Sequence, residues 1–178
     1  MSRASPPTGF TLIELLVTLA IVAILVAIAF PSFEGVLRSN RVATYTNELM
    51  TSLSLARSEA TRNPTGAALC TSTDGVACGG GWNDGWMVWI DLDGNGAADV
   101  GERVVRYVQG NPDLVLSGTA SAGSPLRIGF DNRGRTVGVA RSYILSLQPS
   151  GCPSGQELLR QLNVQPTGQV RITRGNCA

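Results

Sequence analysis

The sequence has no histidine and no lysine among its 178 residues. The absence of histidine excludes serine–histidine–aspartate triads, cysteine–histidine nucleophile pairs and histidine-ligated metal sites. All 14 basic residues are arginines, and with 13 acidic residues they leave a formal net charge of +1, which gives no whole-chain attraction to nucleic acid. The sequence also lacks a P-loop and a Gly-x-Ser-x-Gly motif. We therefore predict a protein that is not an enzyme.

A long apolar run lies near the start of the chain, from Phe10 to Phe30, and Pro31 follows it. About 20 apolar residues are enough for a helix to span a bilayer, so the run predicts a membrane span. It is longer than the apolar core of a cleavable secretory signal. Glu14 interrupts the run, and a carboxylate at such a depth either lies near the membrane surface or needs a partner.

The segment Gly9-Phe10-Thr11-Leu12-Ile13-Glu14-Leu15 resembles the class III signal of type IV pilins and type II secretion pseudopilins. The resemblance implies that a prepilin peptidase in the inner membrane removes residues 1–9 by cutting after Gly9, and then methylates Phe10. It also implies that Glu14 pairs with the α-amino group of a neighbouring subunit in a helical filament. Physical chemistry agrees with this pairing, because a buried carboxylate needs a cation.

The apolar pattern predicts that the helix continues beyond the membrane. Between residues 42 and 60, apolar residues recur at spacings of three and four, as on one face of an amphipathic helix. Asn63-Pro64 ends the pattern, because the residue before a proline disfavours the helical region. We predict one helix from Phe10 to about Arg62, with residues 10–30 in the membrane or filament core and residues 31–63 as an amphipathic periplasmic part.

Residues 64–178 show a period-two pattern with frequent Gly and Pro, which is typical of short strands joined by turns. The candidate strands are 66–70, 86–90, 103–108, 126–130, 135–140, 143–147 and 170–173. A helix followed by such strands predicts an α+β fold, in which a long N-terminal helix packs on a C-terminal antiparallel β-sandwich-like domain. The segment 55–63, followed by Leu69-Cys70, resembles the minor pilin and pseudopilin branch called GspH/FimT.

The four cysteines contain no Cys-x-x-Cys spacing, so the sequence indicates neither a zinc ribbon nor a thioredoxin-type site. The resemblance places the domain in the oxidising periplasm, where disulfides are expected. Four cysteines can pair in three ways. We favour the one in which both bridges join cysteines close in sequence, Cys70–Cys78 and Cys152–Cys177.

An acidic segment from Asp91 to Glu102 matches the calcium-binding loop of EF-hands residue by residue. The candidate calcium ligands are Asp91, Asp93, Asn95, Asp99 and Glu102. The flanks look like strands, however, and the same residues are good turn formers. A polar hairpin turn without a metal is therefore the alternative.

Arginines gather late in the chain, where residues 127–178 hold seven arginines and two acidic residues, a net of +5. Several FimT-like pilins bind DNA through a Gly-Arg-x-Arg motif, which the segment 168–174 resembles except that Gln169 replaces the first arginine. The candidate DNA contacts are Arg133, Arg135, Arg171 and Arg174. Exposed arginines that bind nothing are the alternative.

Three tryptophans, Trp82, Trp86 and Trp89, lie close together in sequence. On a strand Trp86 and Trp89 would face opposite sides, so we expect at least one of them in the core. Core packing or a partner contact is favoured over a stacking platform for bases.

Together these features predict a minor type IV pilin that primes or joins pilus assembly and displays its β-domain. A DNA-binding competence pilin and a minor pseudopilin of type II secretion are the alternatives. The expected partners are other minor and major pilins, the prepilin peptidase and the inner membrane, with double-stranded DNA in the competence alternative. We expect the chain in the inner membrane, with a periplasmic domain, before assembly and in the filament at the cell surface afterwards.

Overall fold

The first element is one long helix. The computed structural model describes residues 9–139 and 141–177, with the backbone alone for residues 29–32. Helix α1 spans Leu12–Arg62, so the predicted long helix is confirmed, although it begins at Leu12 rather than Phe10. The Thr11 hydroxyl caps it by accepting a hydrogen bond from the Glu14 backbone amide at 3.3 Å. The predicted leader lies outside the described residues except for Gly9.

The chain divides into a first unit, Met1–Ser39, and a second unit, Asn40–Ala178. Among the described residues, no single helix is by itself long and apolar enough to cross a membrane. The pieces Leu12–Ile28 and Phe33–Arg62 meet that requirement only together, by length and composition. The membrane span expected at residues 10–30 therefore stays a prediction.

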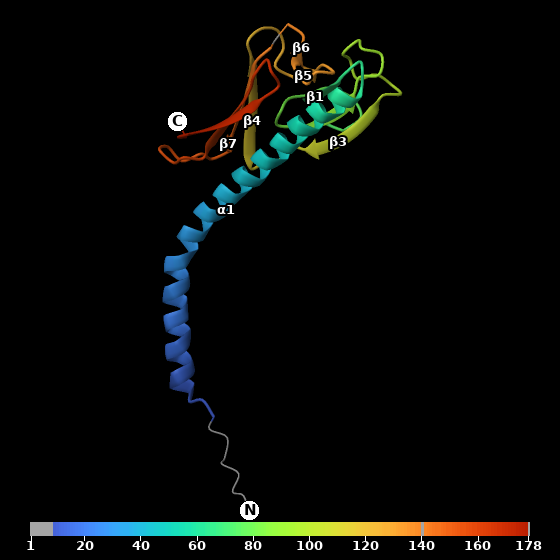
Figure 1. Ribbon diagram of the computed structural model, residues 1–178. Coiled ribbons are helices and arrows are strands. Elements are labelled where there is room, and N and C mark those ends of the chain that lie inside the picture. Colours follow the sequence, from blue (N-terminus) through green and yellow to red (C-terminus); the bar gives the residue numbers. More distant parts are fainter. Residues whose placement is uncertain (1–8, 140, 178) are drawn as a thin grey trace, which may run out of the picture. The chain divides into compact units, whose positions relative to one another are not determined.

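The second unit contains two antiparallel sheets (Figure 1). The first sheet has the strand order β3-β2-β1-β5-β6, and its strands are β1 (Ala67–Thr71), β2 (Gly85–Ile90), β3 (Arg103–Gln109), β5 (Arg127–Phe130) and β6 (Thr136–Val137). The second sheet has the order β4-β7-β8-β9, and its strands are β4 (Leu114–Ala120), β7 (Tyr143–Pro149), β8 (Leu159–Val164) and β9 (Val170–Gly175). The expected α+β fold is confirmed.

The sequence prediction missed strands β4 and β8. The second half of β4 is Ser117-Gly118-Thr119-Ala120, which is not a typical strand sequence, and only its first half carries buried leucines. Strand β8 alternates polar residues with Leu162 and Val164. The strand expected at 135–140 is much shorter, because Gly138 adopts a positive φ of 96° directly after β6; residue 140 lies outside the described residues.

The main core lies between the last part of α1 and one face of each sheet. The apolar stripe predicted on the helix is buried: Val42, Tyr45, Leu49, Leu53, Ala56 and Ala60 all belong to the core. From the first sheet Trp86 and Phe130 join this cluster, and from the second sheet Leu145 and Leu162 join it. The helix therefore supplies the common layer on which both sheets pack.

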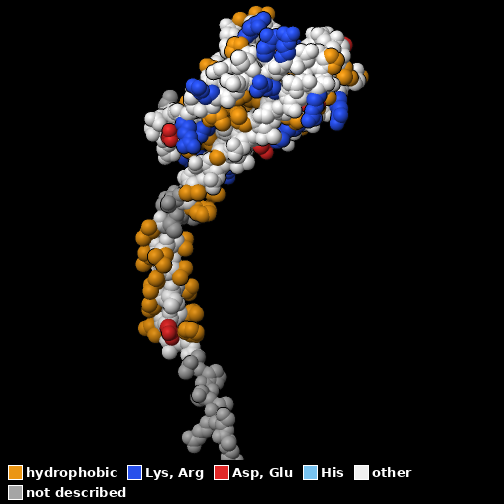
Figure 2. Space-filling view, viewed as in Figure 1, with side chains coloured by type: hydrophobic (Ala, Val, Ile, Leu, Met, Phe, Trp, Pro, Cys, Tyr) orange, Lys and Arg blue, Asp and Glu red, His pale blue; other side chains and the backbone are white. Residues whose placement is uncertain are grey.

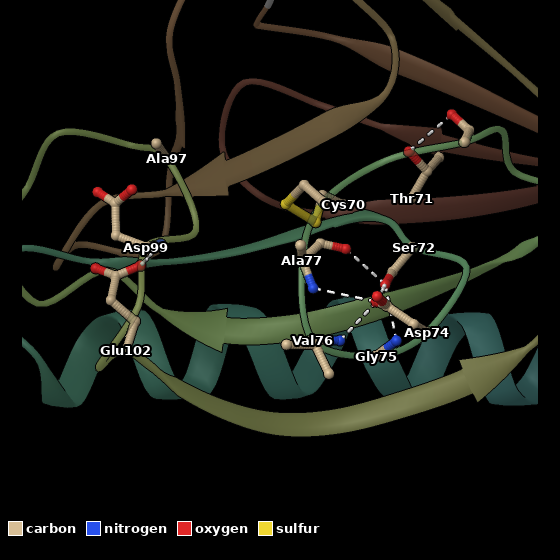
Figure 3. The surroundings of a disulfide bond; sticks show 12 residues. Cys70, Thr71, Ser72, Asp74, Gly75, Val76, Ala77, Ala97, Asp99 and Glu102 are labelled. Atoms are coloured by element: carbon tan, nitrogen blue, oxygen red, sulfur yellow. Dashed lines mark hydrogen bonds between the residues drawn. A yellow bond between two sulfur atoms is a disulfide. The ribbon is translucent and has the colours of Figure 1, made fainter.

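A smaller core lies on the other face of the first sheet, where Ala68, Cys70, Met87 and Trp89 pack together. The loop after β1 is closed by the Cys70–Cys78 disulfide and by the Asp74 carboxylate (Figure 3). This carboxylate accepts hydrogen bonds from the backbone amides of Val76 and Ala77, which lower the pKa of Asp74.

Candidate functional site

The helix surface before residue 29 is apolar on all sides and exposed. Phe10 is 83% exposed and Leu12 is 78% exposed, and every large apolar side chain between Ile13 and Ile28 is at least half exposed. Figure 2 shows this stretch covered by hydrophobic side chains. A helix that is apolar all round belongs in a membrane or inside a large assembly.

Glu14 is the one acidic residue in this apolar stretch. Its backbone amide donates to Thr11, but within the described residues its carboxylate accepts no hydrogen bond and forms no ion pair. Gly9 and Phe10, the residues expected at the cleavage site, are exposed directly before the helix. A carboxylate in such a setting can neutralise a cation supplied by another chain.

The structure contains both disulfides that sequence proximity favoured. Cys70–Cys78 joins the end of β1 to the loop that follows it. Cys152–Cys177 joins the loop after β7 to the residues after β9. Two backbone hydrogen bonds hold Cys177 beside this second bridge: the Cys177 amide donates to the Gln156 carbonyl at 2.9 Å, and the Gly155 amide donates to the Cys177 carbonyl at 3.2 Å.

The acidic segment 91–102 is a loop between strands β2 and β3, not the linker between two helices of an EF-hand. Carboxylate oxygens of Asp91, Asp93 and Glu102 lie within 4.8 Å of one another. The Glu102 oxygens accept hydrogen bonds from the backbone amides of Leu92 at 2.7 Å and Asp99 at 3.1 Å. The other four candidate ligands also accept hydrogen bonds from within the loop, so all five help to build the turn. Calcium binding stays a prediction.

Asp91 is the buried carboxylate of this loop. Burial raises the pKa of Asp91; the Gly94 amide, which donates to it at 2.7 Å, opposes this shift, while the charges of Glu102 and Asp93 add to it. The net shift is upward, so repulsion and burial outweigh the hydrogen bonds. A proton or a cation bound to this carboxylate would offset its unfavourable negative charge.

Arg127 lies close to both the small core and the acidic loop. Its guanidinium carbon lies 5.9 Å from the ring centroid of Trp89, in a cation–π arrangement. The two terminal nitrogens of Arg127 also lie close to Gly96, where an added Cβ would collide with them and where φ is +76°. The positive φ therefore favours glycine at this turn of the loop.

The candidate arginines of the β5–β6 turn differ in their partners. Arg135 forms an ion pair with Asp131 at 3.1 Å, and Arg133 is exposed with no ion pair among the described residues. Burial raises the pKa of Asp131, but the backbone amides of Arg135 and Arg133 and the Arg135 guanidinium lower it more. The turn packs on the β8–β9 turn, because the Thr136 amide donates to the Pro166 carbonyl at 3.2 Å.

The other two candidates, Arg171 and Arg174, are both exposed on β9. The register places Arg171 opposite Asn163 and Arg174 opposite Arg160. Because residues three apart on a strand face opposite sides, these two arginines lie on different faces of the second sheet. The structure therefore brings Arg133 and Arg135 near the start of β9 but does not gather all four arginines on one face.

Arg57 has a role that the sequence analysis did not assign. Its guanidinium donates to the carbonyls of Gly134 at 3.0 Å and Thr167 at 3.3 Å, so it ties both turns to the helix. Arg57 lies in the segment 55–63 that resembles the GspH/FimT branch, and this was the one sequence feature that pointed to it. Nothing local in the sequence shows which groups it contacts.

All three tryptophans are buried, so none offers a stacking surface for bases. Trp86 belongs to the main core and Trp89 to the small core, on opposite faces as expected. The Trp82 indole donates to the Pro125 carbonyl at 3.1 Å. The cluster is part of the cores of the domain.

A family model described as "Type II transport protein GspH" matches residues 45–168, which is more than half of the chain. The chain belongs to the GspH family. A second model, the prokaryotic N-terminal methylation motif, matches residues 8–30. The GspH-family chain is thus a minor type IV pilin or pseudopilin, as the sequence predicted. Its N-terminal motif marks a substrate of prepilin peptidase and implies anchoring in the inner membrane before incorporation into a filament.

Solved structures share the fold of this GspH-family chain. The type IV minor pilin FimU of Pseudomonas aeruginosa PAO1 matches in two crystal forms, with TM-scores of 0.52 and 0.55 and identities of 16% and 14%. These matches cover 74% and 75% of this chain and 91% and 89% of the other. The minor pseudopilin EpsH of the Vibrio cholerae type 2 secretion system matches with a TM-score of 0.50 and 14% identity, over 74% of this chain and 95% of the other. No curated protein matches the chain.

Proposed function

We propose that this GspH-family chain is a minor pilin that enters a type IV pilus through its N-terminal helix. The observation that carries the proposal is the exposed apolar surface of residues 10–28, in which Glu14 is the one carboxylate. Such a surface needs a bilayer before assembly and other helices afterwards. The Glu14 carboxylate then neutralises the α-amino group of a neighbouring subunit, which sets the register of the helices.

Two substitutions test this proposal. Gly9→Val should block removal of residues 1–9, so that only the full-size band appears on an immunoblot, while Gly35→Ala, at a glycine with open space around it, should be processed normally. Glu14→Gln should be processed but largely absent from sheared filaments, while Glu34→Gln should enter them. A mature-sized band for Gly9→Val, or normal filament content for Glu14→Gln, would refute the proposal.

The alternative role as a pseudopilin of type II secretion uses the same helix and the same charge pairing. The two roles differ in the filament that takes up the chain. Fractionation distinguishes them: a minor pilin should co-purify with sheared surface pili, whereas a pseudopilin should stay with the cell envelope. We favour the pilus, and loss of secreted enzymes without loss of pili in a deletion strain would contradict that choice.

Duplex DNA is a second candidate ligand. It is favoured by two exposed arginines that form no ion pair among the described residues, Arg133 in the β5–β6 turn and Arg171 on β9. The β5–β6 turn packs on the β8–β9 turn, which directly precedes β9. Phosphate contacts of this kind make binding salt-dependent. In fluorescence anisotropy with the detergent-solubilised chain, Arg133→Ala and Arg171→Ala should each lower the salt slope by about 0.9. The control is Arg103→Ala, an exposed arginine on β3. No binding at low salt would exclude DNA as a ligand.

A further inference from the structure

Strand β9 forms one edge of the second sheet, and a groove runs beside it. The groove has a volume of about 350 Å³. It lies between helix residues such as Met50, Leu53 and Arg57 on one side and Gly168 of the β8–β9 turn and Val170 of β9 on the other. Its lining combines apolar side chains with hydroxyls. Beside the groove β9 carries four consecutive exposed residues, Arg171 to Arg174.

The hydrogen-bond pattern shows which backbone groups of β9 are unused. At the β8–β9 turn, the Gln165 amide donates to the Gln169 carbonyl at 2.8 Å, so these two residues form a hydrogen-bonded pair of the antiparallel ladder. The alternation then makes residues 171, 173 and 175 the ones that bond to β8. The amides and carbonyls of Val170, Ile172 and Arg174 therefore point away from β8, toward the open edge.

The same three residues share the core face of the sheet. Val170 lies opposite Val164, and Ile172 lies opposite Leu162, both of which are buried. Ile172 nevertheless remains 41% exposed, because nothing among the described residues covers this part of the edge. The edge thus presents free backbone groups and an uncovered apolar side chain at the same positions.

Charge decides what kind of strand this edge accepts. Arg174 lies opposite Arg160, at a pair that the ladder leaves without mutual hydrogen bonds, where side chains approach most closely. Like charges directly opposite one another are destabilising. Arg160 donates to the carbonyls of Glu157 at 2.9 Å and Leu159 at 3.0 Å, and within the described part of the chain no carboxylate forms an ion pair with either arginine. Burial and the charge of Arg174 lower the pKa of Arg160.

We propose that the open edge of β9 binds an extended, acidic segment of a neighbouring pilin, which adds to the second sheet as an antiparallel or parallel fifth strand. The backbone groups of Val170, Ile172 and Arg174 form the new ladder, as in strand addition generally. A carboxylate of the added strand lies beside Arg174, on the side away from Arg160, and offsets the repulsion between the two arginines. Arginines at this edge exclude basic and purely apolar strands, so they select the partner. The identity of the partner as a pilin rests on the function proposed above.

The test uses photo-crosslinking in whole cells that carry the full-length chain. The photoreactive residue p-benzoylphenylalanine replaces Thr173, whose side chain points away from the groove, and a control probe replaces Val100 in the acidic loop. We expect the probe at position 173, but not at position 100, to form an adduct with another pilin, and peptide mapping should place it in an extended segment rich in Asp and Glu.

Two pairs of variants test the mechanism. Ile172→Pro removes an outward-facing amide without removing a bond to β8, and Arg174→Glu reverses the selecting charge; each should lower the adduct yield about tenfold. Ile172→Val and Arg174→Lys should keep the yield. Arg174 is exposed, so Arg174→Glu should leave the fold intact. This variant therefore tests the charge even where Ile172→Pro disturbs folding.

Unchanged yields for Arg174→Glu, or an adduct in a helix or in a segment without acidic residues, would overturn the inference. Loss of the adduct on nuclease treatment would assign the edge to nucleic acid and overturn it as well. Filament content is measured on the same cells. If the wild-type chain is absent from filaments but still forms an acidic-strand adduct, the pilin role fails while strand addition stands.

Discussion

The disulfide Cys152–Cys177 should stabilise the domain more than Cys70–Cys78 does. The two bridges join cysteines 25 and 8 residues apart. Where a bridge acts by restricting the unfolded chain, loops of these lengths correspond to about 3.5 and about 2.5 kcal/mol at 25 °C. The expected difference in the free energy of unfolding is therefore about 1 kcal/mol in favour of the longer loop.

The assay must separate loop closure from the loss of a buried sulfur, because Cys70 and Cys177 are both buried. A Cys70→Ala/Cys78→Ala variant keeps only the long bridge, and a Cys152→Ala/Cys177→Ala variant keeps only the short one. For each variant, urea unfolding in detergent is compared before and after reduction. The emission of the three buried tryptophans reports unfolding.

Reduction should lower the unfolding free energy of the variant with the long bridge by about 3.5 kcal/mol, equivalent to a fall of roughly 10 °C in the midpoint temperature. It should also increase amide exchange in β9, because the bridge holds the chain directly after that strand. An equal or larger loss for the short bridge would refute the loop-length reasoning.

Three further predictions concern the loops. Gly110→Ala should lower the unfolding free energy by about 1–3 kcal/mol in urea titrations, because the added Cβ would collide with the Asn83 backbone carbonyl. The pKa of Asp131 is lowered in the folded protein, so its ionised form stabilises the fold above the unfolded pKa of about 4, and this stability is lost as pH falls through the folded pKa. Asp131→Asn should therefore flatten the pH dependence of the urea unfolding midpoint between pH 6 and pH 2. Calcium at about 1 mM should raise the melting temperature of the wild type but not of Glu102→Gln, and identical curves with calcium and with a chelator would leave the loop as a plain turn.

The helix and the processing motif could be predicted because their signals are local. Spacings of three and four set the buried stripe, and Asn63-Pro64 marked the end that the structure shows at Arg62. The motif at Gly9 to Glu14 is a continuous sequence, so it needed no knowledge of the fold. Both disulfides also join cysteines that are close in sequence.

Strand β4 escaped prediction because a tertiary contact determines its sequence. The Trp82 ring packs so closely on Gly118 that a side chain at this position would collide with the indole nitrogen. Gly118 interrupts the strand pattern in the sequence, but in the structure its missing side chain leaves room for a buried aromatic ring. No local pattern carries that information.

The open edge of β9 also depends on information that a sequence does not display. Which amides face outward follows from the register of β8 and β9, and the close approach of Arg160 and Arg174 follows from the same register. In the sequence these arginines are 14 residues apart and look like two independent charges.

The direct link between α1 and β1 has a mechanical consequence for a subunit that is pulled by its N-terminal segment. The helix that begins at Leu12 ends at Arg62, and β1 follows within a few residues as the central strand of the first sheet. Tension therefore enters the domain along the last part of α1, which is buried in the main core, and passes into a strand that is paired on both sides. The hydrogen bonds of both ladders hold β1 in the sheet, so both neighbouring strands resist its being drawn out.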